Sequence, residues 1–511
     1  MTNNINANGI NSPRSTLSVF LDVVERVGNR LPDPVTIFVG LAVAALGLSW
    51  LVSLLGVSVV HPETGETITA VNLLSRDGIQ KILGNMVENF TGFKPLGTVL
   101  VAMIGVGIAE RTGLFAAMLK WLVTAVPAWA ITPTVVFAGI LSNTAADAGF
   151  VILPPLAGML YASLGRHPVA GIAAAFAGVG GGFSANIVLN ALDPLLSGIT
   201  NEAADLYDDA YDVRATANYF FMIASVPMLT IVGTLVSTRI VERRLGPWKS
   251  GADANALTPL EAHERRGLLA ALVAVIVTAG LMIALVVAKN APLREPDPEG
   301  LAPFFRSIVG LIMIFFFVPG LVYGIVTRQV RSDRDASKMM SESMSAMGSY
   351  IVLAFFAGQA IAYFGWSNIA LIIALKTADF LKSIHFTGVP LLVVFLIVAA
   401  IFNLVLASSS AKWAIMAPIF VPMFMNLGWS PETTQCVYRV GDSITNIITP
   451  LNYYLPISIT AAQRFIPRAG MGTIISATLP YSVAFGLAWI AMLVVWLLLG
   501  LPIGPGAPIR L

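Results

Sequence analysis

An apolar stretch near the end of the sequence carries side chains that could bind ions and polar ligands. It contains Asn403, Lys412, Arg439, Asp442 and Asn446. On insertion scales, an unpaired charged side chain at the centre of a hydrocarbon layer costs about 2.5–3.5 kcal/mol. Prolines also interrupt the stretch, and broken helices survive at membrane depth only where protein or a watery cavity satisfies the freed backbone groups. We therefore predict that this stretch lines a binding site inside a membrane protein.

Asp442 is the strongest candidate for a cation ligand. It lies in an interrupted apolar helix, where a buried carboxylate needs a cationic partner. We expect that partner to be Na⁺ or a proton. The amide oxygens of Asn446, four residues further on, and of Asn403, in the preceding arm, would complete an oxygen-rich site of the kind that hard cations prefer. The alternative is a static ion pair with Arg439, three residues earlier on the same helical face.

Arg439 and Trp413 are candidate substrate contacts. The guanidinium group of an arginine stays charged and forms bidentate pairs with carboxylates. Arg439 therefore either holds a substrate carboxylate or neutralises Asp442. Trp413 follows a serine-rich tip and either stacks on a planar ring of the substrate or packs in the core. We expect the neighbouring Lys412 to extend toward the membrane interface.

The composition is that of a polytopic membrane protein. Of the 511 residues, 56% are hydrophobic and 11% are charged, whereas a soluble domain carries about 25% charged residues. Apolar runs of near 20 residues recur, which is enough to cross a hydrocarbon core of about 30 Å. The net charge of +2 gives no argument for nucleic acid. A single cysteine and four scattered histidines argue against a disulfide framework, a zinc site or haem.

Apolar spans and interrupted segments predict an all-α protein with about nine transmembrane helices plus two re-entrant hairpins. Individual spans are expected near residues 35–60, 96–111, 219–241, 267–287, 307–327, 350–375 and 475–499, and residues 114–128 are expected to form a third span or a surface helix. The predicted regions are a cytoplasmic amphipathic segment (1–34), scaffold helices (35–130), a first hairpin and broken helix (131–200), scaffold helices with cytoplasmic linkers (201–388), a second hairpin and broken helix (389–457), and a final helix with an external C-terminal end (458–511).

Basic residues set the expected orientation. Arginine and lysine gather in the linkers 239–266 and 328–338, which places both linkers in the cytoplasm by the positive-inside rule. The intervening loop, 288–305, is poorer in basic residues and should be external. The N-terminus is then cytoplasmic.

Two blocks, each a hairpin followed by a broken helix, resemble each other at a spacing close to 260 residues. Each has a polar tip, an apolar arm with a proline, a Gly-X-X-Pro turn, a glycine break, a serine–asparagine cluster and a further proline. The matched residues are Pro155 and Pro418, Gly165 and Gly428, Pro168 and Pro431, Ser184 and Ser443, Asn186 and Asn446, and Pro194 and Pro450. The predicted orientation puts the hairpins on opposite sides of the membrane, which is the pattern of inverted repeats that bind substrate and ion where interrupted helices meet.

The first block supplies the counterparts of the charged second block. They are Asn143, Thr144, Ser184, Asn186 and Asp193. We expect Asp193, which precedes a proline, to cap the end of a half-helix. Pro431, in the second block, is expected to shape the hairpin turn.

Three motifs carry a family resemblance: AGILSNTAADAGFVILPPLAG, ASSSAKWAIMAPIFVPMF and YRVGDSITNIITPLNYY. Over nearly the whole chain the sequence resembles the AbgT family of p-aminobenzoyl-glutamate transporters, within the ion-transporter superfamily. The resemblance implies a homodimer in a bacterial inner membrane, each protomer having nine spans and two opposed re-entrant hairpins. It also implies functional roles for Trp413, Pro431, Arg439 and Asp442, with Asn403 and Asn446 near the cation and Ser184 and Asp193 in the first broken helix.

Members of the family are linked to uptake of p-aminobenzoyl-glutamate and to export of sulfonamide antimetabolites. We therefore expect an ion-coupled secondary transporter of p-aminobenzoyl-type compounds, driven by Na⁺ or H⁺, and not an enzyme. The alternatives are a sodium-coupled symporter of another small dicarboxylate, a channel, or an intramembrane enzyme. The sequence lacks a nucleotide-binding motif, His-Glu-X-X-His and Gly-X-Ser-X-Gly, which disfavours ATP-driven transport and familiar intramembrane proteases.

Overall fold

The computed structural model describes residues 34–60, 65–124, 126–145, 148–248, 260–288, 291–294, 301–406, 408–452 and 454–511. The amphipathic helix predicted ahead of the first span lies outside the described residues. Within them, regular structure is almost entirely helical. The strands are a short antiparallel pair, β1 (Ser58–Val60) and β2 (Thr67–Thr69), which connects the first span to the helices that follow.

The helices of the first half are α2 (Pro34–Leu54), α3 (Arg76–Gly84), α4 (Met86–Thr91), α5 (Lys94–Arg111), α6 (Leu114–Thr124), η1 (Ala128–Ala130), α7 (Ile131–Leu141), η2 (Ser142–Ala145), α8 (Ala148–Ser163), α9 (Pro168–Phe176), η3 (Ala177–Gly181), α10 (Leu192–Ala204), α11 (Tyr219–Val236), η4 (Ser237–Val241) and α12 (Glu242–Leu245). Those of the second half are α13 (Ala262–Val287), α14 (Ala302–Arg306), α15 (Ile308–Val326), α16 (Asp333–Ala346), α17 (Gly348–Trp366), α18 (Ile369–Ser383), α19 (Val389–Val405), α20 (Ser409–Asn426), α21 (Pro431–Thr445), α22 (Leu455–Gln463) and α23 (Met471–Leu498).

Several of these helices have the length and composition of membrane spans. Among the described residues, five helices qualify, and up to seven if each of two bent helix pairs counts as one span. One bent pair is α5 with α6, whose axes differ by 61°. The segment predicted as a third span or a surface helix is therefore α6, a short continuation of α5 at a sharp angle.

The single span predicted for residues 350–375 is wrong. Two helices occupy this region, because α17 ends at Trp366 and α18 begins at Ile369. Between them Asn368 adopts a left-handed backbone conformation with a φ angle of 61°, which an α-helix cannot contain. The side chain of Asn368 donates a hydrogen bond to the carbonyl oxygen of Thr69 in β2, which holds this corner in place.

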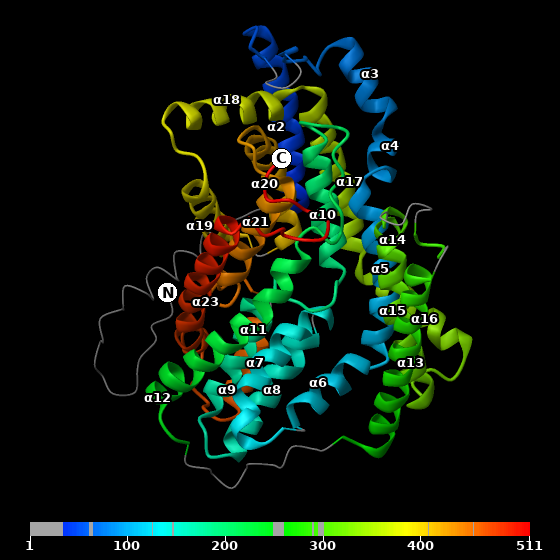
Figure 1. Ribbon diagram of the computed structural model, residues 1–511, viewed down its shortest axis with the longest axis vertical. Coiled ribbons are helices and arrows are strands. Elements are labelled where there is room, and N and C mark those ends of the chain that lie inside the picture. Colours follow the sequence, from blue (N-terminus) through cyan, green and yellow to red (C-terminus); the bar gives the residue numbers. More distant parts are fainter. Residues whose placement is uncertain are drawn as a thin grey trace.

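Both predicted helix interruptions are present. The first consists of the π-helical turn η3, which contains most of the predicted glycine run, and the irregular segment from there to α10; the second lies between α21 and α22. The helix pair α7 and α8 lies with α9 in the lower half of the molecule, whereas α18, α19 and α20 lie in the upper half (Figure 1). The helix pairs α7–α8 and α19–α20 thus occupy opposite halves, while α10, which ends the first block, lies beside α20 and α21.

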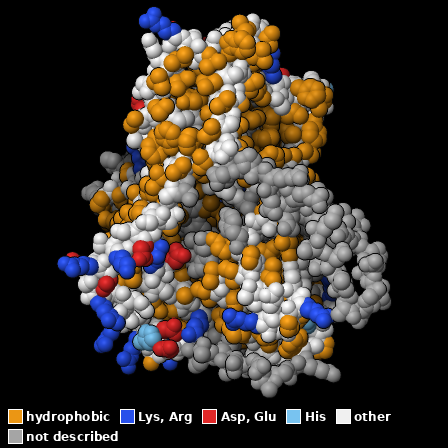
Figure 2. Space-filling model, turned by 180° about the vertical axis from the view of Figure 1, so that it is seen from behind, with side chains coloured by type: hydrophobic (Ala, Val, Ile, Leu, Met, Phe, Trp, Pro, Cys, Tyr) orange, Lys and Arg blue, Asp and Glu red, His pale blue; other side chains and the backbone are white. Residues whose placement is uncertain are grey.

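Charged side chains gather at one end of the molecule, while hydrophobic side chains cover much of the rest of the visible face (Figure 2). Both α12 and the start of α13 lie at the lower end in Figure 1, so the first predicted basic linker begins and ends there. Large apolar side chains of α13 are exposed along its length. Exposed apolar helix surface with most of the charges gathered toward one end is typical of a protein surrounded by lipid.

A segment near the end of the chain, residues 503–511, crosses the turn between α20 and α21. We call it the terminal strap. Ser430 donates hydrogen bonds from its backbone N–H to the carbonyl oxygen of Ile509 (3.1 Å) and from its hydroxyl to that of Pro508 (2.6 Å). The guanidinium group of Arg510 lies 4.0 Å from the ring centroid of Trp429. The strap also accepts backbone hydrogen bonds from the start of α11 at Ile503, so it joins the two elements.

Close contact between α19 and α21 depends on Gly441. A Cβ atom at this position would lie 2.4 Å from the carbonyl oxygen of Leu396 and 2.8 Å from the Cβ atom of Ala399. Both distances are shorter than van der Waals contact, so any side chain here would push the two helices apart. The absence of a side chain lets α19 bring Asn403 against α21.

We predict that Gly441→Ala lowers the stability of the folded protein by about 1–3 kcal/mol, the usual cost of overpacking a close contact. Circular dichroism melting in detergent measures the change. Gly310→Ala is the matched control, because Gly310 is helical and a methyl group added there would have no atom within 4 Å. Equal melting temperatures for the two variants would contradict the proposed contact.

Candidate functional site

The site is built around α21, whose residues are all buried. Ser430 caps the helix by accepting a hydrogen bond from the backbone N–H of Thr433 (3.1 Å), and Pro431 is the first helical residue. Proline suits this position because its missing N–H would have no partner inside the helix. Pro431 thus begins the site helix directly after the hairpin turn, as predicted. The helix packs against α10, α19, α20 and α23.

Arg439 forms a buried ion pair with Asp193 of α10. The Nη1 atom of Arg439 lies 2.7 Å from Oδ1 of Asp193, and the two side chains are 3% and 0% exposed. The other carboxylate oxygen of Asp193 accepts a hydrogen bond from the backbone N–H of Asn190 (2.8 Å). Asp193 is the second residue of α10 and binds the backbone just ahead of the helix, whereas the predicted capping position is occupied by Ala191 without a side-chain hydrogen bond. Its ion pair with Arg439 joins the two blocks. The alternative considered from the sequence, an ion pair between Arg439 and Asp442, is not present, since each has a different partner.

Asp442 forms an ion pair with Lys412 of α20. The ammonium group of Lys412 donates to Oδ1 of Asp442, to Oδ1 of Asn403 (2.5 Å) and to the carbonyl oxygen of Leu406 (3.4 Å). The side chain of Lys412 is fully buried. The expectation that Lys412 extends to the membrane interface is therefore wrong. A carboxylate and two further oxygens lie within its reach in the interior, so it is paired there.

The three predicted cation ligands come together. The side-chain amide of Asn403 donates to the backbone carbonyl of Asp442 (2.6 Å) and to Oδ1 of Asn446 (2.8 Å). The positive charge among these oxygens is supplied in this structure by Lys412. Asn446 also donates to the carbonyl oxygen of Gly180 (3.3 Å), in the glycine break of the first block. The two interruptions are thereby hydrogen-bonded to each other.

In the first block, the polar tip satisfies the broken backbone. The side-chain amide of Asn143 donates to the carbonyl oxygens of Val179 and Gly182, both at 3.2 Å. The backbone carbonyl of Asn143 accepts a hydrogen bond from the side-chain amide of Asn190 (3.0 Å). A broken helix inside a membrane requires partners of this kind for its freed carbonyls. The polar tip and the glycine break of the first block, which are separate in the sequence, are therefore in direct contact.

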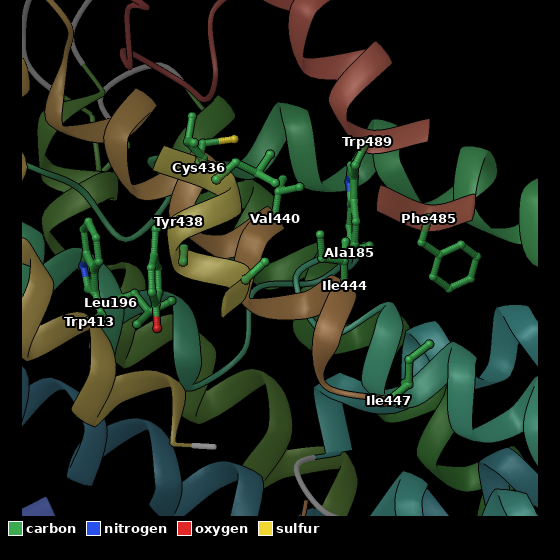
Figure 3. Close-up of a cluster of buried hydrophobic side chains, with 14 of the residues drawn as sticks. Ala185, Leu196, Trp413, Cys436, Tyr438, Val440, Ile444, Ile447, Phe485 and Trp489 are labelled. Carbon is green, nitrogen blue, oxygen red and sulfur yellow. The ribbon is translucent and has the colours of Figure 1, made fainter. Parts of the chain in front are cut away.

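Trp413 lies in the core. Its ring stacks on that of Tyr438, with centroids 4.4 Å apart and planes at 25° (Figure 3). Its indole N–H donates to the hydroxyl of Thr200 in α10 (2.8 Å), and the side chain has no exposed surface. Of the two roles predicted for Trp413, core packing is the one that this structure shows.

Several buried polar atoms of the predicted site residues have no hydrogen-bond partner among the described residues. They are Nε and Nη2 of Arg439, Oδ2 of Asp442 and the hydroxyl of Ser184. Leaving a buried polar atom unsatisfied costs roughly 1–3 kcal/mol, and more for a charged group. Such atoms are uncommon in folded proteins, and a ligand or ion is one way to satisfy them.

A cavity of about 300 Å³ lies beside these ion pairs. Both hairpin tips and both interrupted segments contribute to its wall. Its lining residues are Val99, Met103, Val106, Asn143, Thr144, Phe150, Phe183, Asn190, Ala191, Leu192, Leu195, Met347, Tyr350, Ser409, Asn446, Thr449, Asn452 and Tyr454. Of the predicted substrate residues, Asn143 lines the cavity, and Asn446 of the predicted cation set does too. The others, Trp413, Pro431, Arg439, Asp442, Ser184 and Asp193, lie outside its lining.

Sequence reasoning missed the aromatic part of this wall. Phe150, Tyr350 and Tyr454 do not stand out in an apolar sequence, because aromatic residues occur throughout it. Asn190 and Asn452 did carry a signal, since each is an amide inside a predicted interruption.

Apolar helices, two interrupted helices that contact each other, and a cavity between them define a membrane transporter. The chain belongs to the AbgT putative transporter family, whose model matches residues 19–511. It is 40% identical over 491 residues to the p-aminobenzoyl-glutamate transport protein of Escherichia coli K12, covering 96% of each chain. The protein is therefore a multi-pass membrane protein of this family.

Two solved structures are similar. The Alcanivorax borkumensis YdaH transporter has a TM-score of 0.89 at 41% identity, covering 93% of this chain and 100% of its own. Neisseria gonorrhoeae MtrF, described with a class of antimetabolite efflux pumps, has a TM-score of 0.90 at 45% identity, covering 96% of this chain and 100% of its own.

We predict that Asp193→Ala destabilises the protein by about 3–5 kcal/mol, because it leaves the Arg439 guanidinium buried without its partner. The double variant Asp193→Ala with Arg439→Met should recover much of that loss, since no unpaired charge remains. Thermal melting of the wild type, both single variants and the double variant gives the coupling energy. Additive losses would show that the pair is not energetically coupled.

Proposed function

We propose that the chain is an ion-coupled secondary transporter of p-aminobenzoyl-type compounds. The observation that carries this proposal is the 40% identity, over 96% of both chains, to a p-aminobenzoyl-glutamate transport protein. The similarity to MtrF supports export of sulfonamide antimetabolites as a second activity. Both kinds of compound contain a p-aminobenzoyl-like ring, which a cavity with aromatic walls suits.

The proposed architecture is nine spans plus two re-entrant hairpins in inverted repeats. Three observations support it. The helix pairs α7–α8 and α19–α20 lie in opposite halves of the molecule (Figure 1), both tips line one cavity, and Asn446 bonds to the opposite break at Gly180. We further propose a transport core of residues 131–200 and 389–457, a homodimer, and placement in a bacterial inner membrane with a cytoplasmic N-terminus.

The proposed substrate contacts are the predicted ones: Trp413, Pro431, Arg439, Asp442, Ser184, Asp193 and Asn143. Arg439 is supported by its two unpartnered nitrogens, Nε and Nη2, which can donate a bidentate pair of hydrogen bonds to a carboxylate. Asn143 is supported by its place in the cavity wall.

Na⁺ is the proposed coupling ion, with H⁺ as the alternative. The residues that would hold Na⁺ are Asn403, Asp442 and Asn446. Oxygens of Asn403 and Asp442 accept hydrogen bonds from the Lys412 ammonium, and Oδ1 of Asn446 accepts one from the Asn403 amide. The unpartnered Oδ2 of Asp442 fits this role, because it leaves one carboxylate oxygen available. Bound Na⁺ would supply a positive charge in the site, and its gradient across the membrane would drive transport. Lys412 and Na⁺ are then competitors for the same oxygens.

We predict that purified protein in proteoliposomes carries p-aminobenzoyl-glutamate with a rate that saturates and rises with an imposed Na⁺ or H⁺ gradient. Arg439→Ala and Asp442→Ala should abolish the flux while the protein still inserts. Arg265→Ala, a change within the basic linker, serves as the control and should transport normally. Flux that increases linearly with concentration would indicate a channel, and wild-type flux in either site variant would refute the site assignment. Sulfonamide accumulation in cells with and without the protein establishes the direction.

We predict that Lys412→Met melts at a lower temperature than the wild type, and that NaCl raises its melting temperature more than choline chloride of equal concentration. The reason is that Asp442 has lost its counter-charge while the oxygens for Na⁺ remain, and a ligand that binds only the folded state stabilises it. The double variant Lys412→Met with Asp442→Asn should lose the Na⁺ effect. Identical melting in the two salts would refute the cation site.

A further inference from the structure

The cavity lies between the two repeats and two neighbouring helices. The tips and interruptions of the repeats contribute Asn143, Ser409 and Asn446 to its wall. Val99 and Met103 of α5 and Tyr350 of α17 also line it. At about 300 Å³ it is at the lower end of the range of small-molecule sites. This volume suits a molecule built on a single aromatic ring.

No charged side chain lines the cavity among the described residues. Its polar groups are the neutral amides of Asn143, Asn190, Asn446 and Asn452, with hydroxyl groups beside them. The nearby cations Lys412 and Arg439 do not line it, and each is paired with a carboxylate. An anion in this cavity would be desolvated without a counter-charge, which is strongly unfavourable. An uncharged polar ligand meets no such penalty.

A stacked pair of rings forms one wall. The centroids of Phe150 and Tyr454 are 4.7 Å apart and their planes differ by 8°. Phe150 is also held edge-on by Phe176, at 5.6 Å and 63°. Phe150 comes from α8 in the first block, and Tyr454 follows the interruption in the second. Flat aromatic faces attract other planar rings in offset or edge-to-face arrangements.

The hydroxyl of Tyr350 is buried and has no hydrogen-bond partner among the described residues. Tyr350 lies in the cavity wall, as do residues of both hairpin tips. A buried hydroxyl without a partner is costly, and an oxygen acceptor in the cavity would satisfy it. Carbonyl and sulfonyl oxygens are acceptors of the right kind, and neither needs a cation.

We propose that this cavity is a subsite for an uncharged aryl amide or aryl sulfonamide group. Its ring packs against the stacked pair of Phe150 and Tyr454, the asparagine amides bind its polar substituents, and Tyr350 donates to its carbonyl or sulfonyl oxygen. The inference rests on the proposed transport of p-aminobenzoyl-type compounds and adds which part of them the cavity recognises. The ring with its neutral amide or sulfonamide is sufficient for binding here, and a free carboxylate is not required. A small aliphatic dicarboxylate is excluded as a ligand of this subsite.

Equilibrium binding of radiolabelled sulfanilamide to the purified protein in detergent tests the proposal. We expect saturable binding that p-aminobenzamide displaces and succinate does not. Tyr350→Phe and Phe150→Leu should each raise the dissociation constant about fivefold to tenfold, the effect of losing one hydrogen bond or one ring contact. The matched controls are Tyr363→Phe, in the same helix as Tyr350, and Phe115→Leu, since neither residue lines the cavity. Both should bind as the wild type does.

Three results overturn the subsite: no saturable sulfanilamide binding, displacement by succinate, or equal affinities in the cavity and control variants. Melting temperatures of all four variants identify any general loss of folding. Tyr350→Phe removes only a hydroxyl group, so its effect on binding can be interpreted even if Phe150→Leu disturbs packing. Because binding is measured separately from flux, failure of the subsite can be distinguished from failure of the proposed transport function. Binding with the expected variant pattern but without gradient-driven flux would refute the transporter and leave the subsite standing.

Discussion

Four buried charges on three helices determine how this protein is assembled. Arg439 and Asp442 lie three residues apart on α21, and each is matched by a charge from another helix, Asp193 from α10 and Lys412 from α20. Removing one member of such a pair leaves an uncompensated charge in the interior, which is far more costly than the pair itself. The position of α21 is therefore set from two sides, and a shift of one of the three helices disturbs the others.

Small residues let the helices around the ion pairs approach closely, because a side chain at these contacts would hold the backbones apart. Gly441 provides this against α19, and in the first block Gly139 and Gly178 meet backbone to backbone. These contacts bring the polar tip at Asn143 within reach of the broken backbone that it satisfies. Packing and polar satisfaction are thus parts of one arrangement.

Much of this arrangement could be predicted from the sequence, because polar residues and glycines stand out in an apolar chain. The two interruptions, and the meeting of Asn403, Asp442 and Asn446, followed from that contrast. The partners of the charges did not. A local rule favoured Arg439 with Asp442, whereas the actual partner of Arg439 is 246 residues away. Nothing in the sequence distinguished Phe150 and Tyr350 as cavity residues. An aromatic residue that lines the cavity and one that faces lipid are both surrounded by apolar residues in the sequence. Asn368, which divides α17 from α18, follows Ser367 in a mostly apolar run, and two polar residues alone do not indicate a corner.

The terminal strap has a mechanical consequence for the second hairpin. Its hydrogen bonds to Ser430, and those from the start of α11 to Ile503, tie the outer turn of the hairpin to a neighbouring element at several points. At the opposite end of α20, which borders the cavity, the hydroxyl of Tyr438 donates to the carbonyl oxygen of Ser409 (2.6 Å), and Lys412 pairs with Asp442. The helix is therefore anchored at both ends, by the strap at the outer end and by α21 at the end that meets the cavity.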